Sequence, residues 1–219
     1  MEVTVRLRVA VLISGRGSNM RALIDSCLNN ESRAEIVLVI SNRPNAGGLS
    51  LATKSGIETA VIDHKGFTDK KAFETELGRT LKSANVELIC LAGFMRLLSP
   101  DFVNGWRDRL INIHPSLLPA FKGLNTHERA IVTGVRVTGC TVHFVRPQMD
   151  DGPIIIQGVV PVHSNDTEEK LAERVLKMEH HCYPLAVQWI AEGRVRVIDE
   201  QAIVDNSGTA TTQLINPER

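Results

Sequence analysis

The sequence predicts an α/β fold, a Rossmann-like and mostly parallel twisted sheet with helices on both faces and an antiparallel C-terminal part. Over the first half of the chain, short apolar runs alternate with stretches of helical periodicity. This alternation implies right-handed crossovers and a parallel sheet covered on both faces. In the second half, two apolar runs are joined by a short link without helical character, which indicates an antiparallel pair.

The first half supplies five strands and three helices. Apolar runs that end at Gly, Ser or polar residues predict strands at 8–13, 36–40, 59–62, 88–92 and 110–113. Apolar residues at helical spacing predict helices at about 19–27, 48–54 and 69–83. The first of these helices carries Met20, Leu23, Ile24 and Cys27 at i, i+3, i+4 and i+7.

The second half of the chain shows a different order of predicted strands and helices. Strands are expected at 138–145 and 154–161, and His127 is expected on a short helix before them. A long helix should start at Asp166 or Thr167, and Pro184 should kink or break it before Gly193. We expect one domain over 1–202, with an N-terminal half of about 1–106 and a C-terminal half of about 107–202. The polar residues 203–219 are expected to form a loosely held tail.

Composition limits the function classes. The 219 residues contain 25 Lys+Arg and 25 Asp+Glu, and this zero balance argues against a general nucleic-acid binder. No apolar run reaches the roughly 18 residues of a membrane span, and the N-terminus does not look like a signal peptide. The four cysteines are far apart and form no C-x-x-C pair, so we expect reduced thiols, no structural zinc and a cytoplasmic protein.

The segment Gly15-Arg-Gly-Ser-Asn19 lies between the first strand and the first helix. Glycines let the backbone approach a ligand, and the start of a helix offers free N–H groups to an anion. Because Met20 follows Asn19, the segment is not G-x-G-x-x-G, and one phosphate fits better than a dinucleotide. The alternative is a tight turn in which Ser18 or Asn19 caps the helix.

Asn112 and His114 stand at strand spacing just before a proline-rich loop, so their side chains share one face. Asp150, in the loop between the last two predicted strands, is a candidate partner for His114. A carboxylate beside an imidazole favours the imidazolium, and a cationic donor next to an amide can stabilise an oxyanion. The alternative is a histidine merely satisfied at a strand end. No H-E-x-x-H or similar spacing occurs, so no metal is expected.

Several segments together resemble the phosphoribosylglycinamide formyltransferase family, over about residues 8–200. They are Ile13-Ser-Gly-Arg-Gly-Ser-Asn19, Leu91-Ala-Gly-Phe-Met-Arg-Leu-Leu-Ser-Pro100, Ile111-Asn-Ile-His-Pro-Ser-Leu-Leu-Pro119, Val142-His-Phe-Val145, Asp150-Asp-Gly-Pro153 and Glu179-His180. The third segment alone is shared with other folate-dependent formyltransferases. All of them in this order are specific.

The resemblance implies a role for each segment. The catalytic residues would be Asn112, His114 and Asp150. The ribonucleotide would be bound by Gly17, Ser18, Asn19, Met20, Arg21, Leu176, Lys177, Met178 and Glu179. The folate would be bound by Lys70, Met95, Arg96, Leu97, Leu98, Asn112, Arg146, Pro147, Gln148, Met149 and Asp150. The N-terminal half would then bind the phosphate, and the C-terminal half would carry catalysis and bind folate.

Two departures from the family pattern stand out. Lys70 replaces an Arg that many relatives carry beside the folate tail, which keeps the charge but loses the bidentate fork. Lys122-Gly123 replaces a Pro-Gly of some relatives, and we expect it to alter the loop without touching the chemistry.

Met95 to Leu98 could also be core packing rather than a wall for a flat heterocycle.

The expected activity is transfer of the formyl group of 10-formyltetrahydrofolate, a co-substrate, to N1-(5-phosphoribosyl)glycinamide. No nucleic-acid or membrane partner is expected, and the protein should be a monomer or homodimer. A 10-formyltetrahydrofolate hydrolase is an alternative, although those relatives carry an extra N-terminal domain. A methionyl-tRNA formyltransferase would carry a C-terminal basic domain. A phosphosugar-binding module without catalysis would not need His114 and Asp150.

Overall fold

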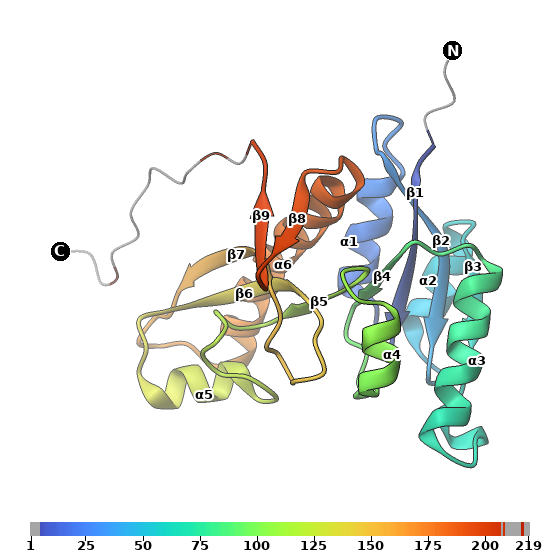
Figure 1. The fold of residues 1–219 in the computed structure, drawn as a ribbon. Helices are drawn as coiled ribbons and strands as arrows, with labels where there is room; N and C mark the ends of the chain where they lie inside the picture. The colour runs from blue at the N-terminus through green and yellow to red at the C-terminus, as the bar shows by residue number, and fades with distance from the viewer. Residues whose placement is uncertain (1–4, 207, 209–215, 217–219) are drawn as a thin grey trace. The chain divides into compact units, whose positions relative to one another are not determined.

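A computed structural model describes residues 5–206, 208 and 216 of the chain (Figure 1). Strands β1 to β7 follow one another in the hydrogen-bonded order β3-β2-β1-β4-β5-β6-β7, and β8 and β9 form a separate hairpin. The chain divides into two compact units. The N-terminal unit holds residues up to Asn112 together with Phe144–Pro147, and the C-terminal unit holds Ile113–His143 and the residues from Gln148. The division falls inside β5, six residues beyond the expected position.

The N-terminal unit contains every strand and helix predicted for it, each within two residues of the expected bounds. Its parallel strands are β1 (Leu7–Ile13), β2 (Ala34–Ser41), β3 (Glu58–Val61), β4 (Leu88–Leu91) and the first part of β5 (Leu110–His114). Its helices are α1 (Ser18–Cys27), α2 (Gly47–Lys54), α3 (Lys70–Ser83) and α4 (Pro100–Gly105), with a 3₁₀ turn at His64–Gly66. The short α4 was not predicted.

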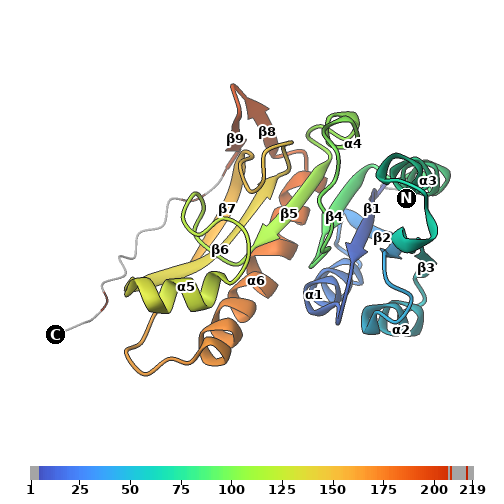
Figure 2. The same ribbon diagram turned by 90° about the horizontal axis from the view of Figure 1, so that it is seen from below.

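Both faces of this parallel sheet are covered. Ala10 and Leu12 of β1 belong to a buried cluster with Phe73 and Leu77 of α3 and Phe102 of α4. The alternate residues of β1 face the other way and are also fully buried, namely Val9, Val11 and Ile13. Figure 2 shows α1 and α2 on the side of these strands opposite to α3 and α4. A strand buried on both faces explains why the sequence shows continuous apolar runs here rather than alternation.

The C-terminal unit is built on the antiparallel pair predicted for it, β6 (Val137–Phe144) and β7 (Ile154–Pro161). Two glycines allow its elements to approach closely. A Cβ on Gly139 would lie 1.8 Å from the Gly158 carbonyl oxygen, and a Cβ on Gly158 would lie 2.2 Å from Met178 Cγ. Its remaining elements are α5 (Thr126–Thr133), α6 (Glu168–Ala191), β8 (Val195–Ile198) and β9 (Gln201–Val204).

Helix α6 runs through Pro184 and ends at Ala191, so of the expected kink or break the break does not occur. A proline inside a helix costs about 3 kcal/mol. Here Cys182, Tyr183, Ala186 and Val187 are buried on either side of it, so packing offsets that cost. The Thr167 hydroxyl caps the helix start by accepting from Lys170 N–H at 3.3 Å.

The β8–β9 hairpin was also not predicted, and β9 extends to Val204, past the expected start of the tail. Most of the expected tail lies outside the described residues. Asn216 is described, and its side-chain amide donates to the Val162 carbonyl at 3.0 Å. Within the described part of the chain, none of the helices is both long and apolar enough to cross a membrane.

Candidate active site

The loop between β1 and α1 is packed against the start of α2. Gly17 has a left-handed φ of 76°, and a Cβ there would meet Gly48 Cα at 3.0 Å. A Cβ on Gly48 would in turn lie 2.5 Å from Ile13 Cδ1, and the Gly48 N–H donates to the Gly15 carbonyl at 3.1 Å. Glycine is therefore required at both positions by the close approach of two backbones.

This contact brings together the N-termini of two helices, and neither has a side-chain cap. The N-cap of α1 is Gly17 and that of α2 is Ala46. Neither Ser18 nor Asn19 takes the capping role of the alternative interpretation. The first bond of α1 runs from Arg21 N–H to the Gly17 carbonyl at 2.9 Å, so the N–H groups of 18–20 have no carbonyl partner within the helix. Such N–H groups attract an anion.

The side chains of this segment differ in what they can offer. Met20 is fully buried, so only its backbone can reach a ligand. Arg21 is exposed and lies 3.6 Å from Asp25 of the next helical turn. Ser18 is exposed and Asn19 half-buried. In the predicted phosphate segment, the groups that can contact a phosphate are therefore the backbone N–H groups and the side chains of Ser18 and Asn19.

A series of hydrogen bonds between polar groups connects the carboxyl ends of β1 and β2 with the loop after β4. This network was not predicted from the sequence. The Ser14 hydroxyl, after β1, donates to Asn42 Oδ1 at 2.5 Å and accepts from Met95 N–H at 2.8 Å. Asn42, after β2, lies 3.3 Å from His64 Nδ1 through its side-chain nitrogen. These bonds fix the start of the loop that follows β4.

The Met95–Leu98 loop alternates between inward and outward side chains. Met95 and Leu97 are 60% and 69% exposed, whereas Leu98 packs against the core cluster. The Arg96 guanidinium lies 5.8 Å from the Phe73 ring centroid, so its side chain is turned toward α3. Half of the loop is therefore core packing, and the other half is an exposed apolar surface, so the role of the loop as a wall for a heterocycle stays a prediction.

Lys70 and Arg146, two expected folate contacts, have partners inside the N-terminal unit. Lys70 lies 4.0 Å from Glu74, whose carboxylate also accepts from Ser99 N–H at 2.6 Å. Arg146 is buried and donates to Asp108 at 2.7 Å. The guanidinium of Arg146 is thus engaged in an ion pair with Asp108, whereas Pro147, Gln148 and Met149 of the same segment are exposed.

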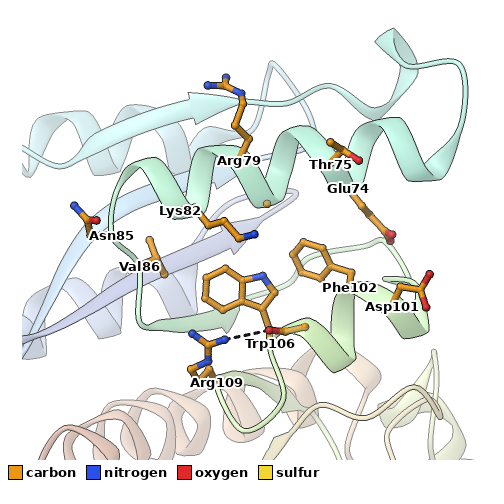
Figure 3. Close-up of a pocket in the computed structure, with 12 residues that line it drawn as sticks. Glu74, Thr75, Arg79, Lys82, Asn85, Val86, Asp101, Phe102, Trp106 and Arg109 are labelled. Atoms are coloured by element: carbon orange, nitrogen blue, oxygen red, sulfur yellow. Dashed lines mark hydrogen bonds between the residues drawn. The ribbon is translucent and has the colours of Figure 1, made fainter.

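A cavity of about 780 Å³ lies elsewhere in the N-terminal unit, between α3, α4 and the chain that follows α4 (Figure 3). Phe102 and Trp106 line it together with Lys82 and Arg109. The Arg109 guanidinium lies 4.8 Å from the Trp106 ring centroid and donates to the Gly105 carbonyl at 3.1 Å. Of the predicted site residues, none lines this cavity.

In the C-terminal unit, His114 and Asp150 are brought together. His114 Nδ1 lies 3.5 Å from Asp150 Oδ2, and both side chains are nearly buried. Asp150 has a left-handed φ of 51°, and its Oδ2 also accepts from Gly123 N–H at 2.9 Å. The Lys122-Gly123 step, expected to lie away from the chemistry, therefore contacts the pair directly.

The other ring nitrogen of His114, Nε2, lies 3.0 Å from the Phe121 carbonyl oxygen. A carbonyl only accepts, so Nε2 carries a proton. In a neutral ring, Nδ1 would then present its lone pair to the Asp150 carboxylate. An Nδ1 that also carries a proton would face the Asp150 carboxylate, at a distance longer than a good hydrogen bond. For His127 nearby, burial and then the charge of His114 lower the pKa.

A second network of buried hydrogen bonds holds the loop after His114, and it was not predicted from the sequence either. The Thr141 hydroxyl donates to the Ser116 carbonyl at 2.7 Å and accepts from Leu118 N–H at 3.0 Å. Gln157 donates to the Leu118 carbonyl at 2.9 Å. The Ser116 hydroxyl donates to the Ala120 carbonyl at 2.6 Å, which gives that serine a part in shaping the loop.

The predicted contacts on α6 cannot all serve one ligand, because residues 176–179 span a full helical turn. Glu179 is buried and Lys177 is exposed, so they lie on different faces. Met178 faces Gly158. Among the described residues, no group of three or more His, Cys, Asp or Glu is placed to hold a metal ion.

The chain is similar in sequence and in structure to known proteins of one family. Residues 7–187 match the family model described as formyl transferase. The chain is 41% identical over 199 residues to phosphoribosylglycinamide formyltransferase of Escherichia coli (strain K12), covering 91% of this chain and 94% of that protein. Glycinamide ribonucleotide transformylase 1 from Symbiobacterium toebii has a similar crystal structure, with a TM-score of 0.88 at 41% identity over 91% of this chain and 94% of that one.

A longer relative matches more closely in sequence. The chain is 53% identical over 194 residues to the trifunctional purine biosynthetic protein adenosine-3 of Gallus gallus. The match covers 89% of this chain but only 19% of the length of that protein.

Proposed function

The chain belongs to the phosphoribosylglycinamide formyltransferases of the formyl transferase family, and we propose that it transfers a formyl group from 10-formyltetrahydrofolate to the amine of N1-(5-phosphoribosyl)glycinamide. The amine would attack the formyl carbon, so that a new C–N bond forms and negative charge develops on the formyl oxygen. The bond to folate N10 then breaks, and the proton lost by the amine passes to N10.

The pair of His114 and Asp150 carries this proposal. Nε2–H of His114 is already donated to the Phe121 carbonyl at 3.0 Å. Nδ1 lies 3.5 Å from Asp150, longer than the 2.7–3.2 Å of a good N–H···O bond, so it can turn to a substrate oxygen. Asn112, two residues earlier on β5, would add the second donor to that oxygen. Asp150 would keep His114 charged.

The substrates would use the other predicted residues selectively. We assign the ribonucleotide phosphate to the uncapped start of α1 at Gly17, Ser18 and Asn19, and the glycinamide end to Glu179. We assign the pterin to the exposed side chains of Met95 and Leu97 and to the 146–150 turn. Lys70 keeps its place as a candidate for the folate tail, because its contact with Glu74 is long at 4.0 Å.

The test is to incubate the protein with 10-formyltetrahydrofolate and to follow deformylated folate, with and without the ribonucleotide. Turnover that requires the ribonucleotide is expected. His114→Ala and Asn112→Ala should each lose on the order of 10²–10³-fold in kcat. His163→Ala is the matched control, since His163 is exposed and its described hydrogen bonds are made by its backbone N–H and carbonyl.

The same assay separates the alternatives. Equal turnover without the ribonucleotide would mean a hydrolase. Binding of the ribonucleotide without turnover would mean a phosphosugar-binding module. Near-normal kcat in His114→Ala would contradict the role given to the pair.

A further inference from the structure

The loop Ala120–Asn125 holds both members of the His114–Asp150 pair through its backbone. The Phe121 carbonyl accepts from His114 Nε2 at 3.0 Å. Two residues later, Gly123 N–H donates to Asp150 Oδ2 at 2.9 Å. The distance between imidazole and carboxylate therefore depends on the conformation of this one loop.

That conformation is unusual for the backbone. Phe121, Gly123 and Asn125 have φ values of 54°, 81° and 55°, all in the left-handed region. For residues other than glycine, each such conformation is strained and persists only when its surroundings hold it. Phe121 has a large ring and no local polar group to favour this φ, so an external contact is needed.

Arg129, on the first turns of α5, makes the contacts that hold the loop. Its Nη1 donates to the Lys122 carbonyl at 2.6 Å and to the Leu124 carbonyl at 3.3 Å. Its guanidinium carbon lies 5.4 Å from the Phe121 ring centroid. One planar group thus fixes both carbonyls that flank Gly123 and covers the ring that precedes them.

We propose that Arg129 is a positioning residue for the reaction, acting through the Phe121 carbonyl and the Gly123 N–H on the His114–Asp150 pair. It touches neither reacting group. Lysine would not fully replace it: both carbonyl bonds come from Nη1, and an ammonium at the place of that nitrogen would lack the guanidinium carbon that lies over the Phe121 ring. The role in turnover rests on the proposed function, whereas the effect on His114 does not.

The first test therefore needs no substrate. The ¹⁵N and ¹H NMR signals of the His114 imidazole are followed against pH in the wild-type chain and in R129A, R129K and R129Q. We expect the pH dependence of these signals to differ between the wild type and R129A, and R129K to resemble R129A. Arg136→Ala is the control, since Arg136 is an exposed arginine of the same unit whose side chain makes no described contact. An unchanged His114 titration in R129A would overturn the inference.

The second test is kinetic. R129A should lose about tenfold in kcat with little change in KM, and its pH profile should move with the NMR titration. In the H114A background the same substitution should have no effect. Equal losses in both backgrounds would show that Arg129 does not act through His114. If the NMR titration moves but the wild-type chain transfers no formyl group, the proposed function fails and the positioning role stands.

Discussion

The ion pair between Asp166 and Arg174 gives a stability prediction whose size follows from the structure. Asp166 precedes α6, its side chain is only 2% exposed, and both of its oxygens accept from Arg174 at 2.8 Å. The hydrogen bonds from Arg174 lower the pKa of Asp166 from 3.8 to about 2. At about 1.36 kcal/mol per pKa unit, this corresponds to about 2 kcal/mol of folding free energy at neutral pH.

The sign of the pH dependence is fixed by the direction of this shift. Because the pKa of Asp166 is lower in the folded chain, the unfolded chain binds more protons between the two values. The stabilisation is complete above about pH 5 and is lost as the pH falls through 3.8 toward 2. Asp166→Asn should therefore cost about 2 kcal/mol at pH 7 and progressively less at pH 4 and pH 3.

Urea unfolding followed by far-UV circular dichroism is a suitable measurement, since α6 is the longest helix. Glu76→Gln is the matched control. Glu76 also bonds an arginine through both oxygens, Arg79 at 2.8 and 2.6 Å, but its side chain is 36% exposed and that of Arg79 is 67% exposed, so this pair should contribute less. A loss in Asp166→Asn that does not depend on pH, or an equal loss in Glu76→Gln, would refute the reasoning.

Three further predictions address packing, titration and anion binding. Gly139→Ala should prevent correct folding, because its Cβ would lie 1.8 Å from the Gly158 carbonyl oxygen; an unchanged urea midpoint would contradict this. Burial lowers the pKa of His127, so the cost of protonating this side chain should destabilise the folded chain as the pH falls below about 6.5. In His127→Gln the melting temperature should therefore change less between pH 7 and pH 5 than it does in the wild type. Gly48→Ala should weaken ribonucleotide binding measured by calorimetry more than it lowers stability, because its Cβ would displace Ile13 and the Gly17 loop.

The elements of the N-terminal unit could be predicted because their signals are local. Each strand is one apolar run, and α1 shows its buried face at helical spacing. The short α4 lacks a periodic pattern, and its only signal was Ser99 followed by Pro100, a capping residue and a proline at the first helical position. The β8–β9 hairpin turns at Asp199 and Glu200, both left-handed, and neither residue type marks such a turn strongly.

The candidate site could be predicted only where it is made of side chains with a characteristic chemistry. Asn112, His114 and Asp150 were identified as candidates, and the contact of His114 with Asp150 spans 36 residues that no local pattern connects. The groups that complete the pair are the backbone carbonyl of Phe121 and the backbone N–H of Gly123, groups that every residue type except proline possesses. A sequence therefore shows the side chains of a site more readily than the backbone that orients them.

In the proposed mechanism the two nitrogens of His114 have different tasks: Nε2 orients the ring, and Nδ1 donates to the substrate oxygen. A neutral imidazole bonded through Nε2–H to the Phe121 carbonyl would have no second proton to donate. Only the imidazolium has one, and its cost in a nearly buried position is offset by the Asp150 carboxylate. The carbonyl thus determines which nitrogen faces Asp150, and the carboxylate is an acceptor toward which a proton on this nitrogen would point. An oxyanion donor at this position requires both contacts, and both depend on the loop from Ala120 to Asn125.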